Sequence, residues 1–295
     1  MIKLIAVDMD GTLIDKTHGI SHENCSMIRK AQTLGVKFVV ATGRLYNEVS
    51  AMLKQYDISC ECITMNGAEY YDKSGTCIEG IYFDKSKAKE IFDFMQNENK
   101  FALEVYTDKG CYTVEPRLKF LYGFMKRARI YHTDYNFYQK IFYALRNTHF
   151  RQVKHIKNID DFLASDLNIA KFVSYSDNES DIAALKKKFK IIDNVAVSGS
   201  FTTNIEVNDA LATKGNSIKK IAMRENIKED EIMVIGDGLN DMSMFKNFPT
   251  NSIAMGNAIP EIKDIASSIT TDCDNSGVAV AIKNILDQNQ QELPN

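Results

Sequence analysis

The fold is decided by the stretch Leu4-Ile5-Ala6-Val7-Asp8-Met9-Asp10-Gly11-Thr12-Leu13, near the start of the chain. An apolar run from Ile2 to Val7, broken by a single lysine, is typical of a buried strand. Asp8 and Asp10 follow it directly, and ionised carboxylates are costly to bury unless a metal, a cation or hydrogen bonds compensate them. We therefore expect the pair at the carboxyl end of the strand, where open α/β sheets bind ligands.

Strands and helices alternate around this stretch and again near the other end of the chain. Near-continuous apolar runs of this kind are typical of parallel strands that are buried on both faces. The predicted elements are a helix capped by Ser21, strands over 36–41, 62–65, 231–235 and 252–255, helices over 45–56 and 216–225, and a hairpin over 69–83.

The middle of the chain is more aromatic and less regular than either end. Mixed strands and helices there indicate a separate α+β domain, and insertion of a domain at a surface loop is well tolerated. The predicted fold class is therefore α/β, with a Rossmann-like core and parallel sheet built from residues 1–83 and 209–295, and an α+β domain inserted over 84–208. Its predicted strands cover 101–107, 111–114, 170–175 and 191–198, and its predicted helices cover 86–98, 117–126, 135–146 and 179–189.

Composition narrows the class of protein. The 295 residues are 44% hydrophobic and 25% charged, a globular profile, and the net charge of −3 does not support a broad nucleic-acid-binding surface. No apolar stretch reaches the roughly 18 residues that span a bilayer, and Asp8 interrupts the first apolar run too early for a signal peptide. We expect a cytoplasmic protein with no nucleic-acid or membrane partner.

The six cysteines and five histidines are scattered along the chain. The cysteines fit no zinc-binding spacing, and Cys60-x-Cys62 is expected to be a pair of reduced thiols. No histidine pairs with a cysteine or a carboxylate at metal-ligand spacing, so we expect no histidine-based metal site.

Polar residues begin where the predicted core strands stop. In a parallel sheet all carboxyl ends lie on one edge, so these groups can converge. Several carboxylates at one place need a divalent cation, and oxygen ligands without histidine or cysteine favour Mg²⁺. A hydroxyl and an amine can bind phosphate oxygens, while one carboxylate attacks phosphorus and another transfers protons. The converging residues are Asp8, Asp10, Thr42, Gly43, Arg44, Lys214, Asp237, Asn240 and Asp241.

Five short motifs occur in the order and at the spacing of a known family. Each motif alone is a weak signal, but the ordered set resembles the haloacid dehalogenase superfamily of phosphatases, and specifically its Cof-type branch. The resemblance covers the predicted core, and the middle domain resembles the family's larger α/β cap only in position and size. The motifs are Asp8-Met9-Asp10-Gly11-Thr12-Leu13, Thr42-Gly43-Arg44, Asn66-Gly67-Ala68, Lys214-Gly215 and Gly236-Asp237-Gly238-Leu239-Asn240-Asp241.

The resemblance implies a role for each residue. Asp8 would be the nucleophile and Asp10 the general acid and base. Mg²⁺ would be held by the Asp8 carboxylate, the Asp10 backbone carbonyl and Asp237, with Asp241 orienting the metal or its waters. The phosphoryl group would be bound by Thr42, the backbone N–H of Gly43, Lys214 and the backbone N–H of Met9, with Asn240 positioning Lys214 or the phosphate.

The expected activity is Mg²⁺-dependent hydrolysis of phosphate monoesters of small metabolites, such as sugar phosphates or phosphorylated cofactors, with the inserted domain acting as a lid. A phosphomutase on the same scaffold, a phosphoacceptor signalling domain and a non-catalytic phosphometabolite-binding protein are the alternatives. Arg44 could form a structural salt bridge or touch substrate, and Asn66-Gly67 could be a turn or a substrate contact. The identity of the substrate and the oligomeric state are left open.

Overall fold

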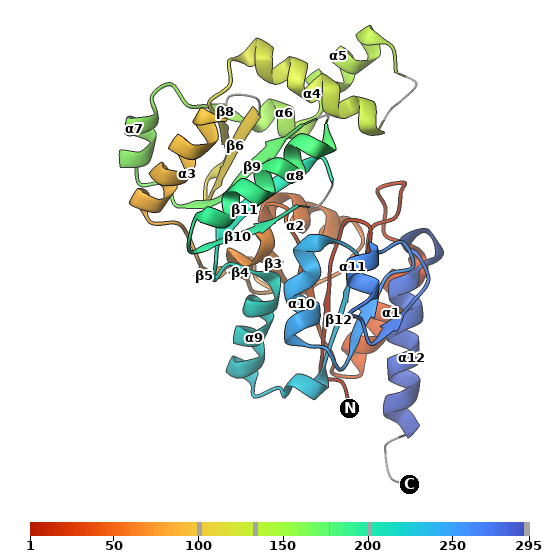
Figure 1. Ribbon diagram of the computed structural model, residues 1–295. Helices are drawn as coiled ribbons and strands as arrows, with labels where there is room; N and C mark the ends of the chain where they lie inside the picture. Colours follow the sequence, from red (N-terminus) through yellow and green to blue (C-terminus); the bar gives the residue numbers. More distant parts are fainter. Residues whose placement is uncertain (99–101, 132–134, 177, 200–201, 292–295) are drawn as a thin grey trace. The chain divides into compact units, whose positions relative to one another are not determined.

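The computed structural model describes residues 1–98, 102–131, 135–176, 178–199 and 202–291. It divides into two compact units. The core unit comprises Met1–Ile81 and Ala210–Asn295, and the insert unit comprises Tyr82–Asp209. In Figure 1 the red and blue ends of the chain make up the core unit, and the yellow and green middle makes up the insert unit. No helix among the described residues is long and apolar enough to cross a membrane.

The core unit is built on one sheet, drawn from both ends of the chain. It contains β1 (Leu4–Val7), β2 (Lys37–Ala41), β3 (Glu61–Thr64), β4 (Glu69–Tyr71), β5 (Cys77–Gly80), β12 (Ile232–Gly236), β13 (Ser252–Ala254) and β14 (Ser268–Ile269). Among the described residues the strand order is β14-β13-β12-β1-β2-β3-β4-β5. Neighbours from β14 to β3 are parallel, whereas β4 and β5 pair antiparallel. The end of β1 is therefore flanked by the ends of β12 and β2.

Two pairs of helices pack together in the described part of this unit. The helix α1 packs against α12, and α9 packs against α10. The side chain of Ser21 accepts the backbone N–H of Asn24 and so caps α1, as predicted. All four residues of β1 are fully buried, which stabilises the unit because burial of a side chain such as Ile5 contributes about 1.5–3 kcal/mol. The helices are α1 (His22–Thr33), α2 (Tyr46–Gln55), α9 (Lys214–Glu225), α10 (Met242–Asn247), α11 (Pro260–Lys263) and α12 (Gly277–Gln291).

The insert unit has a mixed sheet of its own. It contains β6 (Ala102–Thr107), β7 (Gly110–Thr113), β8 (Lys154–His155), β9 (Ile169–Tyr175), β10 (Val195–Ser198) and β11 (Asn204–Asp209). The order among the described residues is β10-β11-β9-β6-β7-β8, antiparallel except for the parallel pair β7–β8. The α/β fold class with a second α+β unit is thus confirmed.

The two faces of the insert sheet differ in character. One face carries apolar residues such as Val105 and Phe172, which form a hydrophobic cluster with the helices α3, α7 and α8. Side chains alternate between faces along a strand, so Glu104, Tyr106 and Lys171 lie on the opposite face. The helices of this unit are α3 (Lys85–Asn97), α4 (Arg117–Tyr131), α5 (Phe137–Arg146), α6 (Thr148–Gln152), α7 (Ile159–Ala164) and α8 (Glu179–Lys188).

Some predicted elements were wrong in their bounds. The strand expected over 191–198 begins only at Val195, because the chain first makes a turn in which Asn194 has a φ of 60°. The strand β11 was not predicted, because its alternation of polar and apolar residues was not recognised. The helix expected over 216–225 begins at Lys214, with Thr213 as its cap. The predicted start of β6 at Phe101 lies outside the described residues.

Candidate active site

Asp8 lies directly beyond the carboxyl end of the central strand β1. Its backbone N–H donates to the carbonyl of Ile235 on β12 at 3.0 Å, which continues the sheet by one residue. Its carboxylate is only 4% exposed and meets the ammonium of Lys214, with 2.5 Å between Lys214 Nζ and Asp8 Oδ1. The tertiary structure thus joins two residues that stand 206 positions apart in the sequence.

Lys214 is fully buried and bridges two carboxylates. Besides Asp8, its ammonium donates to Asp241 Oδ1 at 2.7 Å. The lysine sits in the first turn of α9, where Thr213 caps the helix by accepting the backbone N–H of Asn216 at 3.3 Å. A buried ammonium needs such partners, since an unpaired charge in the interior is very costly.

Asp237 and Asp241 come from the loop that follows β12. Asp241 Oδ2 accepts the backbone N–H groups of Asp237 at 2.9 Å and Gly238 at 3.0 Å, so this carboxylate shapes the loop as well as holding Lys214. Asp237 Oδ1 accepts the hydroxyl of Thr12 at 2.9 Å, which ties the loop to the Asp-x-Asp segment. Donor oxygens of Asp8, Asp237 and Asp241 lie within 4.8 Å of one another.

The cluster of Asp8, Asp237 and Asp241 has more negative than positive groups. Burial, followed by the charge of Asp241, raises the pKa of Asp8 well above its usual value and raises the pKa of Asp237 to about 7. Burial alone would lower the pKa of Lys214, but the charges of Asp241 and Asp8 outweigh it, so the lysine stays protonated. One ammonium therefore faces three carboxylates.

This donor set fits a divalent cation. Three carboxylates with a single lysine leave excess negative charge, and all the converging donors are oxygens, which suits Mg²⁺ better than zinc.

Asp10 has a different partner from Asp8. Arg44 holds both of its oxygens, with Nε 2.8 Å from Oδ2 and Nη2 2.5 Å from Oδ1. The Asp10 side chain is 41% exposed, in contrast to buried Asp8. Of the two roles left open for Arg44, the structure shows the salt bridge.

The remaining predicted residues lie on the same segments. Thr42 is buried after β2 and its hydroxyl accepts the backbone N–H of Arg44 at 3.2 Å, so Gly43 stands between two fixed residues. Met9 is fully buried between the two aspartates. Asn240 lies in the short turn Leu239–Asp241, and in the described structure Lys214 is held by Asp8 and Asp241 rather than by Asn240.

The Asn66-Gly67 segment has a clear structural role. Gly67 has a φ of 107°, and a Cβ there would lie 2.4 Å from the backbone of Thr213, the residue before Lys214. The carbonyl of Gly67 also accepts the hydroxyl of Ser217 on α9 at 2.9 Å. The turn therefore positions the start of α9, and with it the ammonium of Lys214.

Two residues near the cluster were given no role from the sequence. Thr12 binds Asp237 as described above, and Asn257 donates to the carbonyl of Gly11 at 2.8 Å and to Asp237 Oδ2 at 3.4 Å. Thr12 follows β1 and Asn257 follows β13, each a few residues after the strand ends. Their positions after strand ends could have marked them as residues at the edge of the sheet. That Asp237 is their shared partner depends on the fold.

The core unit has a mostly parallel sheet with carboxylates at one edge, and an α+β unit is inserted into its chain. These features define a class of α/β enzymes with an inserted domain. Within that class, the chain belongs to the haloacid dehalogenase-like hydrolase family, whose family model matches residues 5–282. The predicted family and branch are confirmed, and the chain is a phosphatase of the Cof type.

Full-length relatives support this assignment. The chain is 29% identical to phosphatase YwpJ of Bacillus subtilis (strain 168), over 97% of this chain and all of the relative. It is 30% identical to the 5-amino-6-(5-phospho-D-ribitylamino)uracil phosphatase YwtE of the same organism, over 97% of this chain and 98% of the relative. A solved haloacid dehalogenase-like hydrolase from B. subtilis has a TM-score of 0.83 at 29% identity, covering 96% of this chain and all of that one.

Proposed function

We propose that this phosphatase transfers the phosphoryl group of a small phosphate monoester first to Asp8 and then to water. The observation that carries the proposal is the buried contact between Asp8 and Lys214 at 2.5 Å. This contact supports the proposal because a carboxylate that can act as a nucleophile and a fixed positive charge lie together at the edge of the sheet where such folds bind ligands.

In the first step, an oxygen of Asp8 attacks phosphorus while the ester P–O bond breaks. Asp10 gives a proton to the leaving oxygen, which departs as an alcohol. The Asp8 carboxylate is held at the reacting position by Lys214, whose charge also offsets the repulsion between the carboxylate and the incoming phosphate. Thr42 and the backbone N–H groups of Gly43 and Met9 would bind the phosphoryl oxygens.

In the second step, Asp10 takes a proton from water, whose oxygen attacks the phosphorus of the aspartyl-phosphate. The bond to Asp8 breaks and inorganic phosphate leaves. The Arg44 pair fixes the orientation of the ionised Asp10 that this step requires. A Mg²⁺ ion held by Asp8, Asp237, the Asp10 carbonyl and Asp241 would neutralise charge on the transferring group.

The role of Asp8 is tested with p-nitrophenyl phosphate. Asp8→Asn keeps nearly the same shape but removes the charged nucleophile, so hydrolysis should be lost while the circular dichroism spectrum is unchanged. Asp287→Asn, on the exposed side of α12, is the matched control and should retain full turnover. Wild-type turnover in Asp8→Asn would show that another group attacks phosphorus.

The metal requirement is tested by chelation. Treatment with EDTA should abolish hydrolysis, and excess Mg²⁺ should restore it, since one lysine cannot offset three carboxylates. EDTA already saturated with Mg²⁺ is the control and should have no effect. Full activity of the metal-free enzyme would contradict the proposed magnesium site.

The substrate class is proposed from the size of the insert unit and from the relatives. We propose sugar phosphates or phosphorylated cofactors and their precursors, with the insert unit acting as the lid that selects among them. One relative is a phosphatase of 5-amino-6-(5-phospho-D-ribitylamino)uracil, so a phosphorylated ribityl compound belongs in the first panel. Phosphate release measured beside isomer formation separates hydrolysis from phosphomutase activity.

A further inference from the structure

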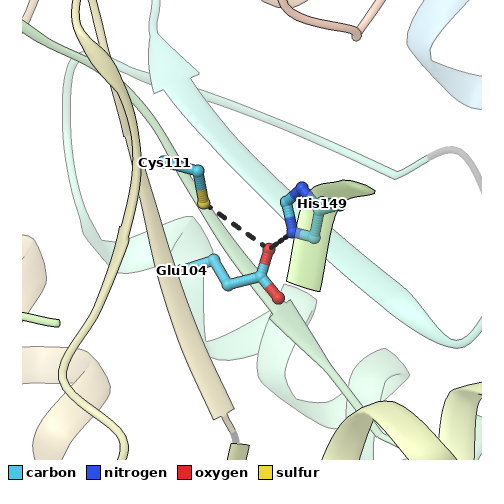
Figure 2. A group of neighbouring side chains, drawn as sticks. All are labelled: Glu104, Cys111 and His149. Atoms are coloured by element: carbon cyan, nitrogen blue, oxygen red, sulfur yellow. Dashed lines mark hydrogen bonds and ion pairs between the residues drawn. The ribbon is translucent and has the colours of Figure 1, made fainter. Parts of the chain in front are cut away.

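A second cluster of metal-binding side chains lies entirely within the insert unit. Glu104 on β6, Cys111 on β7 and His149 on α6 each offer one donor atom, and the three atoms lie within 4.8 Å of one another. Figure 2 shows that the contacts from Cys111 and His149 meet at the same oxygen of the Glu104 carboxylate.

The fold creates this cluster from distant parts of the chain. In the β6–β7 hairpin Cys111 pairs with Tyr106, which makes it the diagonal neighbour of Glu104 on the same face of the sheet. His149 comes from α6, 45 residues after Glu104. Spacing along the sequence does not reveal this cluster, because the fold brings its members together from separate elements.

The distances suit a tetrahedral zinc ion. Zn–S bonds of about 2.3 Å and Zn–N or Zn–O bonds of about 2.0–2.2 Å place donor atoms about 3.3–3.6 Å apart. Glu104 Oε2 lies 3.8 Å from Cys111 Sγ and 2.9 Å from His149 Nε2. These two distances lie within about half an ångström of that range, and the donor atoms of Cys111 and His149 lie no more than 4.8 Å apart.

The positions of the three residues are already well defined. Glu104 is fully buried and Cys111 is 6% exposed. The His149 ring is nearly parallel to two aromatic rings, with its centroid 6.1 Å from that of Tyr106 and 6.4 Å from that of Phe124. Prior ordering of the ligands lowers the entropic cost of binding a metal.

The charges also favour a divalent ion. A carboxylate and a thiolate carry two negative charges, and a neutral imidazole adds none, so one Zn²⁺ gives a neutral site, which is the least costly state in a buried place. The nearby ammonium of Lys171, 4.7 Å from the Tyr106 ring, is paired with Glu206 at 2.9 Å and adds no net charge.

We infer that Glu104, Cys111 and His149 bind a zinc-type divalent cation in the insert unit, at a site separate from the acidic cluster of the core unit. Sulfur, nitrogen and oxygen donors together favour zinc over Mg²⁺, which prefers oxygen ligands alone. Three protein ligands leave one coordination position for water or another ligand. Binding releases the thiol proton of Cys111 to solvent and ties β6, β7 and α6 together.

The test uses Co²⁺ as a spectroscopic probe on the full-length, reduced protein, with excess Mg²⁺ added to compete for the acidic cluster. One equivalent of Co²⁺ should produce the near-ultraviolet charge-transfer band of a cobalt–thiolate bond, and Zn²⁺ should remove it. Cys111→Ser should abolish the band. Cys77→Ser, which removes the exposed cysteine of the core unit, is the matched control and should retain the band.

A second variant keeps the thiol and tests the imidazole. His149→Gln alters a side chain that is 21% exposed and should weaken Co²⁺ affinity about tenfold or more while retaining the band at saturation. This result is decisive even where Cys111→Ser fails to fold. No thiolate band in the wild type, a band that persists in folded Cys111→Ser, or unchanged affinity in His149→Gln would each overturn the inference.

Discussion

Arg44 donates a hydrogen bond to each carboxylate oxygen of Asp10, from Nε at 2.8 Å and from Nη2 at 2.5 Å. Asp8, two residues earlier, is paired instead with Lys214. The two aspartates of one short motif therefore have different cations and different exposure. The strand β1 ends at Val7 and the chain turns at once, with the backbone N–H groups of Leu13 and Thr12 donating to the carbonyls of Asp8 and Met9, so the two carboxylates leave the backbone outside strand geometry, one buried and one 41% exposed. This division suits one group for attack and the other for proton transfer.

Arg44→Lys should reduce the kcat for p-nitrophenyl phosphate by about 10- to 100-fold, because an ammonium cannot hold both oxygens of Asp10 and a misplaced catalytic group costs rate on this scale. Steady-state kinetics measures the change. Arg29→Lys, on the exposed side of α1, is the matched control and should keep the wild-type kcat. An unchanged kcat in Arg44→Lys would show that the pair is dispensable.

The metal-free protein should lose stability as the pH rises from about 4 to 7. The pKa of Asp237 is 3.8 in its ordinary state and about 7 here, so in this window the folded protein holds a proton that the unfolded chain has released. The free energy of unfolding should fall by on the order of a few kcal/mol across the window. Thermal unfolding in EDTA at a series of pH values measures this.

Two comparisons assign that pH dependence to the acidic cluster. Asp237→Asn should weaken it, because the amide does not titrate, while Asp8, whose pKa is also raised, still contributes. Excess Mg²⁺ should weaken it as well and raise the Tm near pH 7, since the cation binds the ionised, folded form. If the Tm changed equally with pH in the metal-free wild type, in Asp237→Asn and in the wild type with Mg²⁺, the pH dependence would not arise from the acidic cluster.

Gly67→Ala should lower the free energy of unfolding more than Gly35→Ala, although both glycines have a positive φ. At Gly35, with a φ of 83° and open space around it, alanine adds only backbone strain of about 1 kcal/mol. At Gly67 the new Cβ would also collide with Thr213, which adds about 1–3 kcal/mol and displaces Lys214. Denaturant unfolding and kcat measure both effects, and equal losses for the two variants would contradict the proposed contact.

Glu206→Gln should destabilise the insert unit by about 3–5 kcal/mol, because it leaves the ammonium of Lys171 buried beside a neutral group. The pair is 2.9 Å apart, with both side chains at most 5% exposed. Asp93→Asn, which breaks the exposed Lys89–Asp93 pair, should cost less than 1 kcal/mol. Chemical denaturation compares the two, and losses of similar size would mean that burial does not matter here.

Parts of the core could be predicted because their signals are local. The apolar run that forms β1 and the cap at Ser21 each depend on residues a few positions apart. The strand β11 was missed because polar residues, Glu206 among them, interrupt its apolar ones, and only the fold buries and pairs these polar side chains. The start of α9 was placed two residues late because Thr213 was not recognised as its cap.

The sequence by itself determined which residues stand at the ends of the core strands, since the apolar runs and the Asp, Thr, Lys and Asp motifs that follow them are local patterns. Only the tertiary structure decided the partners: Lys214 with Asp8 and Asp241, Arg44 with Asp10, and His149 with Glu104 and Cys111. The physical reason is that these contacts depend on sheet register and helix packing, which bring together side chains up to 206 positions apart.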